Sequence, residues 1–463
     1  MSSYSFTSHR EYPSTKACWS ERLPKVLFTT VYREKPFDFL DLGSKEPIRF
    51  SSPAQISPGL RFLKQNVPEL EILEYPTKEE YLRKLEEGWD VVGFSFYGHE
   101  IPEILEMADL AREKGVGELW AGNYGALTPG MELYFDRVFR GYAEEEVASF
   151  FGRKIKEVVH PPLVYSFTSP FWFKLNRFGV ISTSRGCPFR CNFCQIKLFC
   201  PKPYTLPLRS IERVLAYYAE KKIWQVWIFD DTFGVFRQHA EKVISLLEEY
   251  GFYWIPMTTI RILLENWEDW TERGMVGAVI GVESLNQENL DFLKKGHSVR
   301  EVYELAQRVK EKKESGIPPE LRFHKFPHLL AFYMLGFENE TVKGIKESVR
   351  KLKELPFLFT QLFVLTPIPG TELWDYIGEK YGIFESDLHK YDGKHLVWNH
   401  PHLLPEEVER LVKWGMRELN SWALPRYMLR GLPDYFLHLK WHFTHFALTN
   451  TYDYRRERFF ELR

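Results

Sequence analysis

Three of the five cysteines in this chain of 463 residues lie within one short segment, as Cys187, Cys191 and Cys194. Their C-x3-C-x2-C spacing supplies three thiolates, one fewer than the four that saturate a cubane iron–sulfur cluster. One iron of such a cluster would stay open to a ligand from outside the protein. A structural zinc site is the alternative, but zinc sites usually close with four Cys or His ligands, and no nearby Cys–His pair completes this spacing. We therefore predict a [4Fe–4S] cluster held by these three cysteines.

The segment resembles the cysteine motif of the radical S-adenosylmethionine (SAM) enzymes, in which an aromatic residue precedes the last cysteine, as Phe193 does here. The resemblance implies that Phe193 lies at the cofactor and that the amino and carboxylate groups of SAM chelate the open iron. Electron transfer then cleaves SAM to methionine and a 5′-deoxyadenosyl radical, which abstracts hydrogen from an unreactive carbon. Cys200 is either a fourth ligand or, as free cysteines usually are, a buried and inert thiol. We favour the buried thiol for Cys200 and an equally inert one for Cys18.

The elements that must position this motif alternate between strand and helix patterns over residues 178–384. Strand-like runs occur at 180–183, 225–229, 253–258, 278–281, 328–334 and 361–365. Helical patterns lie between them, including 211–221, 238–250 and 298–313. Repeated strand–helix units predict a partial (β/α)6 barrel with its chemistry at the carboxyl ends of the strands.

The resemblance to radical SAM enzymes also implies roles for residues that follow the second and third strands. Asp230 and Asp231 would accept hydrogen bonds from the SAM ammonium group, a charge-assisted contact. The alternative for one of them is to cap the following helix. Arg261 offers a guanidinium suited to the SAM carboxylate, with an ion pair to a neighbouring glutamate as an equal alternative.

The later strand ends carry further family landmarks. The resemblance implies that Glu283 or Ser284 meets the ribose hydroxyls or the methionine moiety of SAM, and residues 290–296 match the family's L-x-x-x-x-K-G passage. Gly336 would let the backbone approach the adenine closely. The turn at 366–373 is like the family's P-x-P-G-T-x-L turn, although Pro and Gly also form rigid turns that bind nothing.

Residues 1–158 show a second alternating pattern. Strands are predicted at 26–30, 69–73, 91–96, 118–121 and 137–140, and helices at 56–65, 78–87 and 101–114. This order predicts a doubly wound, Rossmann-like α/β domain that binds ligands at the carboxyl edge of a parallel sheet.

Within this domain, residues 121–126 and 137–145 resemble the cobalamin-binding domain that precedes many radical SAM domains. The resemblance implies that Ser95, Gly122 and Asn123 contact cobalamin. The D-x-H-x-x-G motif that supplies a histidine to cobalt is absent. Both cobalamin binding without that histidine and a degenerate domain without cobalamin agree with this pattern.

Two further regions complete the predicted organisation. A linker at 159–177 contains Pro161-Pro162 and Ser169-Pro170, which mark irregular chain. Residues 385–463 are predicted to be helical and are rich in aromatic residues and histidines. His438 and His442 fall at helical spacing, so they form either a metal-binding pair or part of an aromatic core. An apolar lid over a lipid-like substrate is the role we expect for this region.

The composition of the chain limits the classes of protein to which it can belong. A formal net charge of −2 gives no indication of a nucleic-acid partner. Five cysteines in so long a chain do not form a disulfide framework, and an oxygen-sensitive cluster predicts an anaerobic, cytoplasmic protein. No run of about 18 apolar residues predicts a membrane span. The Glu and Lys content is typical of a thermophile, and 16% aromatic residues indicate either an apolar pocket or a core rich in Phe.

The leading functional hypothesis is cobalamin-dependent methylation of an unactivated carbon. The alternative is cobalamin-independent radical carbon–carbon bond formation, cyclisation or rearrangement of an isoprenoid or lipid-like substrate. A non-catalytic cofactor carrier is the hypothesis from another class. Methylthiolation is disfavoured because it needs a second cysteine-ligated cluster. The expected partners are a small-molecule or lipid-like substrate and a ferredoxin or flavodoxin as electron donor, with peripheral membrane contact as a further expectation.

Overall fold

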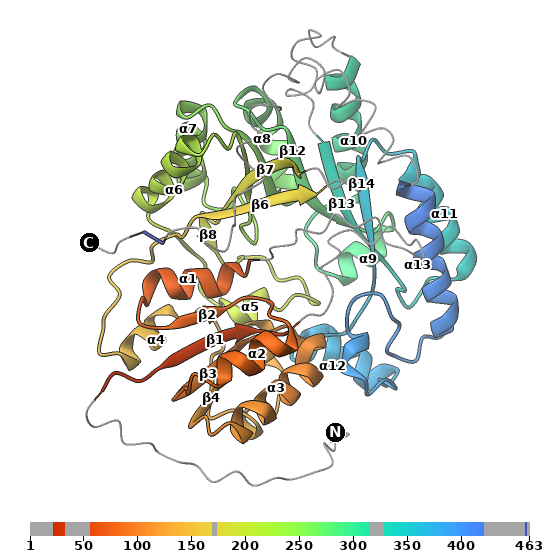
Figure 1. Cartoon of the computed structure of the whole chain (residues 1–463). Helices are drawn as coiled ribbons and strands as arrows, with labels where there is room; N and C mark the ends of the chain where they lie inside the picture. Colours follow the sequence, from red (N-terminus) through yellow and green to blue (C-terminus); the bar gives the residue numbers. More distant parts are fainter. Residues whose placement is uncertain (1–21, 33–55, 169–173, 315–327, 421–458, 461–463) are drawn as a thin grey trace.

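The computed structural model describes residues 22–32, 56–168, 174–314, 328–420 and 459–460. Within these residues the strands form a five-stranded sheet, a seven-stranded sheet and a two-stranded ladder. Figure 1 shows the five-stranded sheet, with its red and orange elements, below the yellow, green and blue elements of the seven-stranded sheet. The chain is therefore an α/β protein, as its sequence predicts.

The five-stranded sheet is entirely parallel and has the order β2-β1-β3-β4-β5. Its strands are β1 (Val26–Thr30), β2 (Glu71–Leu73), β3 (Val91–Ser95), β4 (Glu118–Gly122) and β5 (Arg137–Val138). Its helices are α1 (Pro58–Asn66), α2 (Lys78–Leu85), α3 (Ile101–Glu113) and α4 (Glu144–Phe150). Because side chains alternate across a strand, Leu27 enters a core with α2 and α3, whereas Phe28 enters a core with α1 and α4. The sheet is thus covered by helices on both faces.

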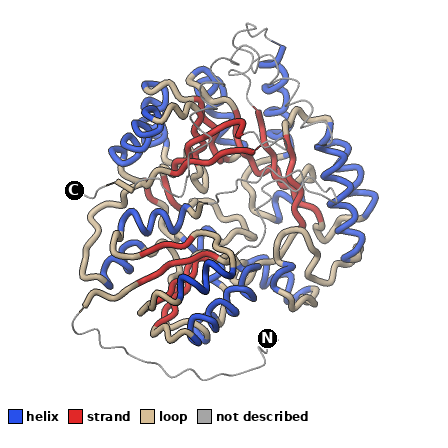
Figure 2. Tube along the Cα trace, in the orientation of Figure 1, coloured by secondary structure: helices blue, strands red, loops and turns tan. Residues whose placement is uncertain are grey.

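The seven-stranded sheet has the order β14-β13-β12-β11-β10-β7-β6. Its strands are β6 (Leu163–Thr168), β7 (Lys174–Ile181), β10 (Gln225–Ile228), β11 (Tyr253–Thr258), β12 (Gly277–Glu283), β13 (His328–Leu335) and β14 (Phe359–Val364). All neighbouring pairs are parallel except β6 with β7. Figure 2 shows these strands in red, with helices in blue around them.

Helices follow the parallel strands of this sheet in turn. They are α6 (Leu208–Glu220), α7 (Arg237–Glu249), α8 (Ile260–Glu272), α10 (Val299–Glu314), α11 (Val342–Lys353) and α12 (Glu372–Lys380), with the shorter α9 (Gln287–Phe292) after β12. The side chains of Thr259, Thr341 and Thr371 accept backbone hydrogen bonds at the starts of α8, α11 and α12. Such caps satisfy helix-terminal N–H groups. They therefore fix where each helix begins after its strand.

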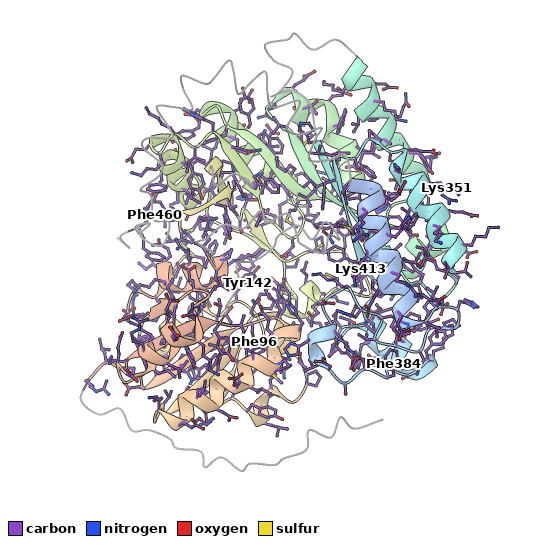
Figure 3. All side chains as sticks on the ribbon, turned by 45° about the vertical axis from the view of Figure 1, so that its right-hand side comes forward. Phe96, Tyr142, Lys351, Phe384, Lys413 and Phe460 are labelled. Atoms are coloured by element: carbon purple, nitrogen blue, oxygen red, sulfur yellow. The ribbon has the colours of Figure 1, made fainter. Side chains whose placement is uncertain are left out.

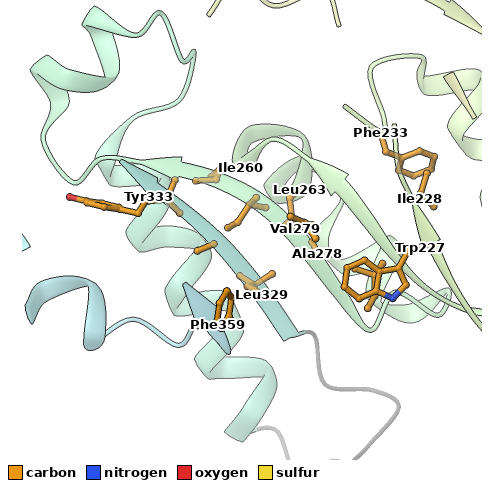
Figure 4. Packing of buried hydrophobic residues seen from close by; sticks show 14 of the residues in the cluster. Trp227, Ile228, Phe233, Ile260, Leu263, Ala278, Val279, Leu329, Tyr333 and Phe359 are labelled. Carbon is orange, nitrogen blue, oxygen red and sulfur yellow. The ribbon is translucent and has the colours of Figure 1, made fainter. Parts of the chain in front are cut away.

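The core of this unit lies between the sheet and these helices. Figure 4 shows Trp227, Val279 and Leu329 from three strands packed with Leu263 of α8. Helix α13 (Pro405–Asn420) packs against β14 and α11. Burial of this apolar surface is the main force that holds each helix against the sheet.

The structure corrects the prediction of irregular chain at 159–177. Residues Leu163–Thr168 form β6, which pairs antiparallel with β7. The sequence signal was misleading because Pro161 and Pro162 lie just before the strand and not within it. The connector therefore extends the larger sheet by one strand.

Other elements contribute to the junction between the two sheets. The ladder of β8 (Ser184–Arg185) with β9 (Tyr204–Thr205) and the short helix α5 (Ile196–Phe199) carry the chain around the cysteines. The amide side chain of Gln65 on α1 exchanges two hydrogen bonds with the backbone of Phe460, which packs against Tyr217 of α6. Figure 3 labels Phe460 beside these elements.

Among the described residues, no helix is long and apolar enough to cross a membrane.

Candidate functional site

The cysteine loop, residues 186–195, follows β7 and β8 at the carboxyl edge of the seven-stranded sheet. It begins with Gly186, whose φ of +80° is in the left-handed region that favours glycine. A Cβ atom at this position would lie 2.8 Å from the Cys200 sulfur. Cys200 is buried directly behind Gly186, as predicted for an inert thiol.

Two of the three predicted ligands contact neighbouring polar groups through their sulfur atoms. The Cys187 sulfur lies 3.2 Å from the Thr232 hydroxyl, and the Cys191 thiol donates to the Lys294 carbonyl at 3.9 Å. Burial raises the pKa of Cys191 and raises that of Cys194 to about 12. Metal ligation requires the thiolate form, so a bound cluster would displace protons from these sulfurs. Three thiols on one loop are the donor set that a cubane cluster with one open iron requires.

The acidic pair after β10 holds this loop in place. Asp230, which is only 1% exposed, accepts hydrogen bonds from the Thr183 backbone N–H at 2.5 Å, the Thr183 hydroxyl at 2.6 Å and the Ser184 hydroxyl at 2.7 Å. Burial raises the pKa of Asp230 to about 6, although these donors oppose the shift. Both oxygens of Asp230 therefore have donors within the protein.

Asp231 acts on the same loop. It accepts the backbone N–H of Gly186 at 2.7 Å, which fixes the residue that precedes Cys187. Thr232, the next residue, contacts Cys187. The segment after β10 thus supports the cysteine loop at three successive positions. Asp230 and Asp231 thus position the chain at the cysteines, and their contact with the SAM ammonium group stays a prediction. Neither aspartate caps α7, whose N-cap residue is Phe236.

Glu283 lies close to the cysteines and has a partner that sequence reasoning did not single out. The Lys295 ammonium group is 2.7 Å from the Glu283 carboxylate, and both side chains are nearly buried. Lys295 also lies 5.8 Å from the centre of the Phe193 ring. The lysine of the family's L-x-x-x-x-K-G passage is Lys295, so that passage held the signal that could have identified it.

Of the other residues predicted to contact SAM, Ser284 and Gly336 lie at the strand ends, whereas Arg261 has an exposed side chain. Arg261 forms an ion pair with Glu301 at 3.0 Å, which is the alternative that the sequence left open for it. The Ser284 hydroxyl is buried and accepts from Asn286 and Asn289. Gly336 has a φ of +85°, and its N–H donates to Glu340 at 2.7 Å. Ser284 and Gly336 thus lie at the carboxyl edge of the sheet, whereas the Arg261 side chain is 56% exposed.

The histidines of the C-terminal region have separate partners. His389 lies 3.5 Å from Glu103, His395 lies 2.9 Å from Asp392, and His400 contacts the Phe337 carbonyl at 2.8 Å. His438 and His442 lie outside the described residues. In the part of the chain that the structure describes, no three His, Cys, Asp or Glu side chains are arranged to hold a single metal ion.

The residues predicted to contact cobalamin gather at the carboxyl edge of the five-stranded sheet. Ser95 and Gly122 are paired across the ends of β3 and β4, and Asn123 follows with a φ of +70°. A Cβ atom at Gly122 would meet only one atom within 4 Å, the Phe94 carbonyl oxygen at 3.8 Å. Tyr97 stacks on Tyr124 with ring centres 6.1 Å apart and is 46% exposed. The end of β4 at Gly122 is thus not crowded by neighbouring atoms, and the stacked rings of Tyr97 and Tyr124 follow the same two strand ends.

This edge faces the cysteine loop of the larger sheet. Tyr124, which follows β4, packs against Phe199 of α5 with ring centres 4.6 Å apart. Arg185 forms an ion pair of 2.6 Å with Glu144 and stacks over Tyr142 at 3.9 Å. Figure 3 places Tyr142 at the boundary between the orange and the green elements. The carboxyl edges of the parallel strands in the two sheets therefore face each other, and the segments on either side of the cysteine loop make the contacts between them.

Similarity to known proteins agrees with this arrangement. Residues 181–352 match the family described as the radical SAM superfamily. An uncharacterized methyltransferase of Pyrococcus horikoshii is 27% identical over 262 residues, which are 55% of this chain and 53% of that protein. Bacteriochlorophyllide d C-8(2)-methyltransferase of Chlorobaculum tepidum is 25% identical, over 52% of this chain and 54% of that protein. The matches thus span about half the length of these relatives.

The solved structure of TsrM, a radical SAM methyltransferase from Kitasatospora setae, has a similar fold. It superposes with a TM-score of 0.61 at 16% identity, covering 85% of this chain and 89% of that protein. At this identity the similarity concerns the fold, and it includes both sheets because the coverage extends well beyond residues 181–352. Residues 181–352, which include the cysteine motif at the strand ends, thus match the radical SAM superfamily.

Proposed function

We propose that this protein is a radical SAM enzyme that methylates an unactivated carbon with cobalamin as the methyl carrier. The observation that carries the proposal is the opposition of the two sheet edges, in which Tyr124 and Glu144 of one contact Phe199 and Arg185 of the other. When bound, the cluster with SAM would supply radical chemistry and cobalamin would supply a methyl group. Transfer of a methyl group needs both cofactors to reach one substrate carbon, and facing edges provide that proximity.

The residues divide between two domains in this proposal. Residues 178–384 form a partial (β/α)6 barrel in which Cys187, Cys191 and Cys194 hold the cluster. Residues 1–158 form the cobalamin-binding domain, with its ligand at the strand ends that carry Ser95, Gly122 and Asn123. The C-terminal region that begins at residue 385, of which the structure describes α13, covers the substrate in this proposal. Asp230 and Asp231 hold the backbone that leads into the cysteine loop.

The relatives favour methylation over the alternative radical reactions. The relatives from Pyrococcus horikoshii and Chlorobaculum tepidum described above are both named as methyltransferases. A further TsrM structure, with a TM-score of 0.57, is described as having cobalamin and a [4Fe–4S] cluster bound. Because the chain matches only part of the relatives' sequences, the substrate is not carried over from their names. We also propose a ferredoxin or flavodoxin as electron donor and a reducing cytoplasmic location.

The test is anaerobic reconstitution with iron, sulfide and hydroxocobalamin, followed by absorption spectroscopy and by iron and cobalt analysis. Binding of about four irons and one cobalt per chain, with SAM cleavage by the reduced protein, is the expected result. Four irons without cobalt would overturn the methylation proposal and favour direct radical coupling or cyclisation. Binding of both cofactors without any SAM cleavage would indicate a carrier and contradict the enzymatic assignment.

A further inference from the structure

The ion pair of Lys295 with Glu283 is built into an unusual piece of backbone. Glu283 has a φ of +60°, a left-handed conformation that is uncommon for a residue with a side chain. It lies at an irregularity in the register between β12 and β13. Gly281, two residues earlier, leaves the space that the pair occupies: a Cβ atom there would lie 2.6 Å from the Lys295 ammonium nitrogen and closer still to the Glu283 carboxylate. The backbone of residues 281–283 thus adopts a conformation that accommodates this ion pair.

Stability alone does not account for such a pair. Two charges lose their hydration when they are buried, and their mutual attraction often no more than offsets that loss. The left-handed glutamate adds a further cost, and costs of this kind are concentrated at functional sites. The burial of two charges and the left-handed backbone both reduce stability, so the pair points to a role in the adjacent site.

The site beside it is the cysteine loop. Burial alone would lower the pKa of Lys295, but Glu283 and the Cys191 and Cys194 thiols raise it above its ordinary value. The geometry places Lys295 at this loop: its ammonium group lies 5.8 Å from the centre of the ring of Phe193, the residue before Cys194. The carbonyl of Lys294, the residue before Lys295, accepts the Cys191 thiol at 3.9 Å. The ammonium group is therefore a positive charge held in a buried position next to two of the three predicted cluster ligands. By contrast, Arg261 is largely exposed and is paired with Glu301.

We propose that Lys295, oriented by Glu283, is a positioning residue that raises the reduction potential of the cluster and so makes its reduction easier. The proposal rests on the cluster-binding part of the proposed function. Reduction adds one electron to the cluster from an external donor, so the product is more negative than the oxidised cluster by one charge. A fixed positive charge in a water-poor environment stabilises that product more than the oxidised form. Glu283 keeps the ammonium directed at the loop and partly cancels its charge.

The experiment measures the midpoint potential of the reconstituted cluster, without SAM, by anaerobic titration monitored by electron paramagnetic resonance. We expect Lys295→Met to retain its iron and to lose at least tenfold in the equilibrium constant for reduction, a downward shift of about 59 mV for one electron. Lys295→Arg should restore most of the potential. Lys294→Met is the matched control: the neighbouring lysine is in the same loop, but its side chain is 55% exposed and pairs with Glu372 at the surface.

A second variant distinguishes electrostatics from simple support of the loop. Glu283→Gln removes the negative partner and should shift the potential upward, opposite to Lys295→Met. A structural role would predict loss of iron in both variants or shifts of the same sign, and either result would overturn the inference. So would an unchanged potential in Lys295→Met, or an equal shift in Lys294→Met. If the unmodified protein takes up no [4Fe–4S] cluster, the proposed function itself is wrong, which is a different outcome from a cluster whose potential ignores Lys295.

Discussion

Arg185 and Glu144 join the two halves of the molecule through a buried ion pair, with Nη2 2.6 Å from Oε1. Arg185 belongs to β8, immediately before the cysteine loop, whereas Glu144 begins the helix that follows the last strand of the five-stranded sheet. The side chains are only 3% and 5% exposed. The pair therefore fixes the cysteine loop relative to the facing sheet edge, on which the proposed transfer between two cofactors depends.

Breaking this pair should be costly. Arg185→Met leaves the Glu144 carboxylate buried without its cation, and we expect a loss of about 3–5 kcal/mol in the free energy of unfolding. The double variant Arg185→Met/Glu144→Gln should lose less than the sum of the single variants, since neither charge is then left alone. Chemical denaturation of the four proteins measures this.

The control for that cycle is the exposed pair of Arg140 with Glu132, whose side chains are 49% and 53% exposed. Because exposed ion pairs contribute little, Arg140→Met should cost less than about 1 kcal/mol. Equal losses at the two arginines would contradict the importance that we give to the buried pair.

Replacing any one of Cys187, Cys191 and Cys194 with alanine should abolish the cluster. Each removal leaves two thiolates, which is too few for a cubane with one open iron. Iron content and the absorbance of the reconstituted protein are the measurements. Cys200→Ala is the control, because Cys200 lies behind the loop and its thiol contacts the Lys202 carbonyl. Retained iron in Cys187→Ala, or its loss in Cys200→Ala, would refute the assignment of ligands.

Gly186→Ala should disturb the cysteine loop by two separable effects. The first is the left-handed backbone, which costs an L-residue about 1–2 kcal/mol. The second is the contact of the new Cβ with the Cys200 sulfur at 2.8 Å. Gly88→Ala isolates the first effect, since Gly88 has a φ of +71° but nothing within 4 Å of its Cβ position. We expect Gly186→Ala to lower stability more than Gly88→Ala does and, unlike it, to lower iron retention. Equal stability and equal iron retention in the two variants would show that the contact of the new Cβ with Cys200 does not disturb the cysteine loop.

Glu340 should give the folded protein a measurable dependence on pH. It is buried and accepts the Gly336 and Phe337 backbone N–H groups, and burial raises its pKa from 4.5 to about 7. The folded state therefore holds this proton more tightly than the unfolded chain does. The stability that this contributes is complete below about pH 4.5 and is lost as the pH rises through about 7.

Glu340→Gln keeps an acceptor oxygen but removes the titration. Between pH 5 and pH 7 the free energy of unfolding of the unmodified protein should fall relative to that of the variant, by at most about 1.4 kcal/mol per pH unit. Denaturation of both proteins across this range provides the comparison. Parallel curves would mean that the pKa of Glu340 is not raised in the folded protein.

The sequence by itself determined the features that depend on residues close together in the chain. The C-x3-C-x2-C spacing identified Cys187, Cys191 and Cys194, and the alternation of apolar runs located the parallel strands to within a few residues. Both signals are local, because ligand spacing on one loop and the periodicity of one element need no knowledge of distant residues. The parallel strands of both sheets confirmed the predicted fold class, and the three cysteines lie within the residues that match the radical SAM superfamily.

Only the tertiary structure decided how distant residues are paired. The packing of β10 beside β7 gave Asp230 the donors Thr183 and Ser184, which the sequence did not indicate. The packing of α8 beside α10 brought Glu301 within reach of Arg261. Lys295 and Glu283, and Arg185 and Glu144, are separated by 12 and 41 residues in sequence. A buried charge needs an opposite charge nearby, because it has lost its contact with water. Which residue supplies that charge depends on how whole helices and strands pack, and no local sequence pattern specifies this packing.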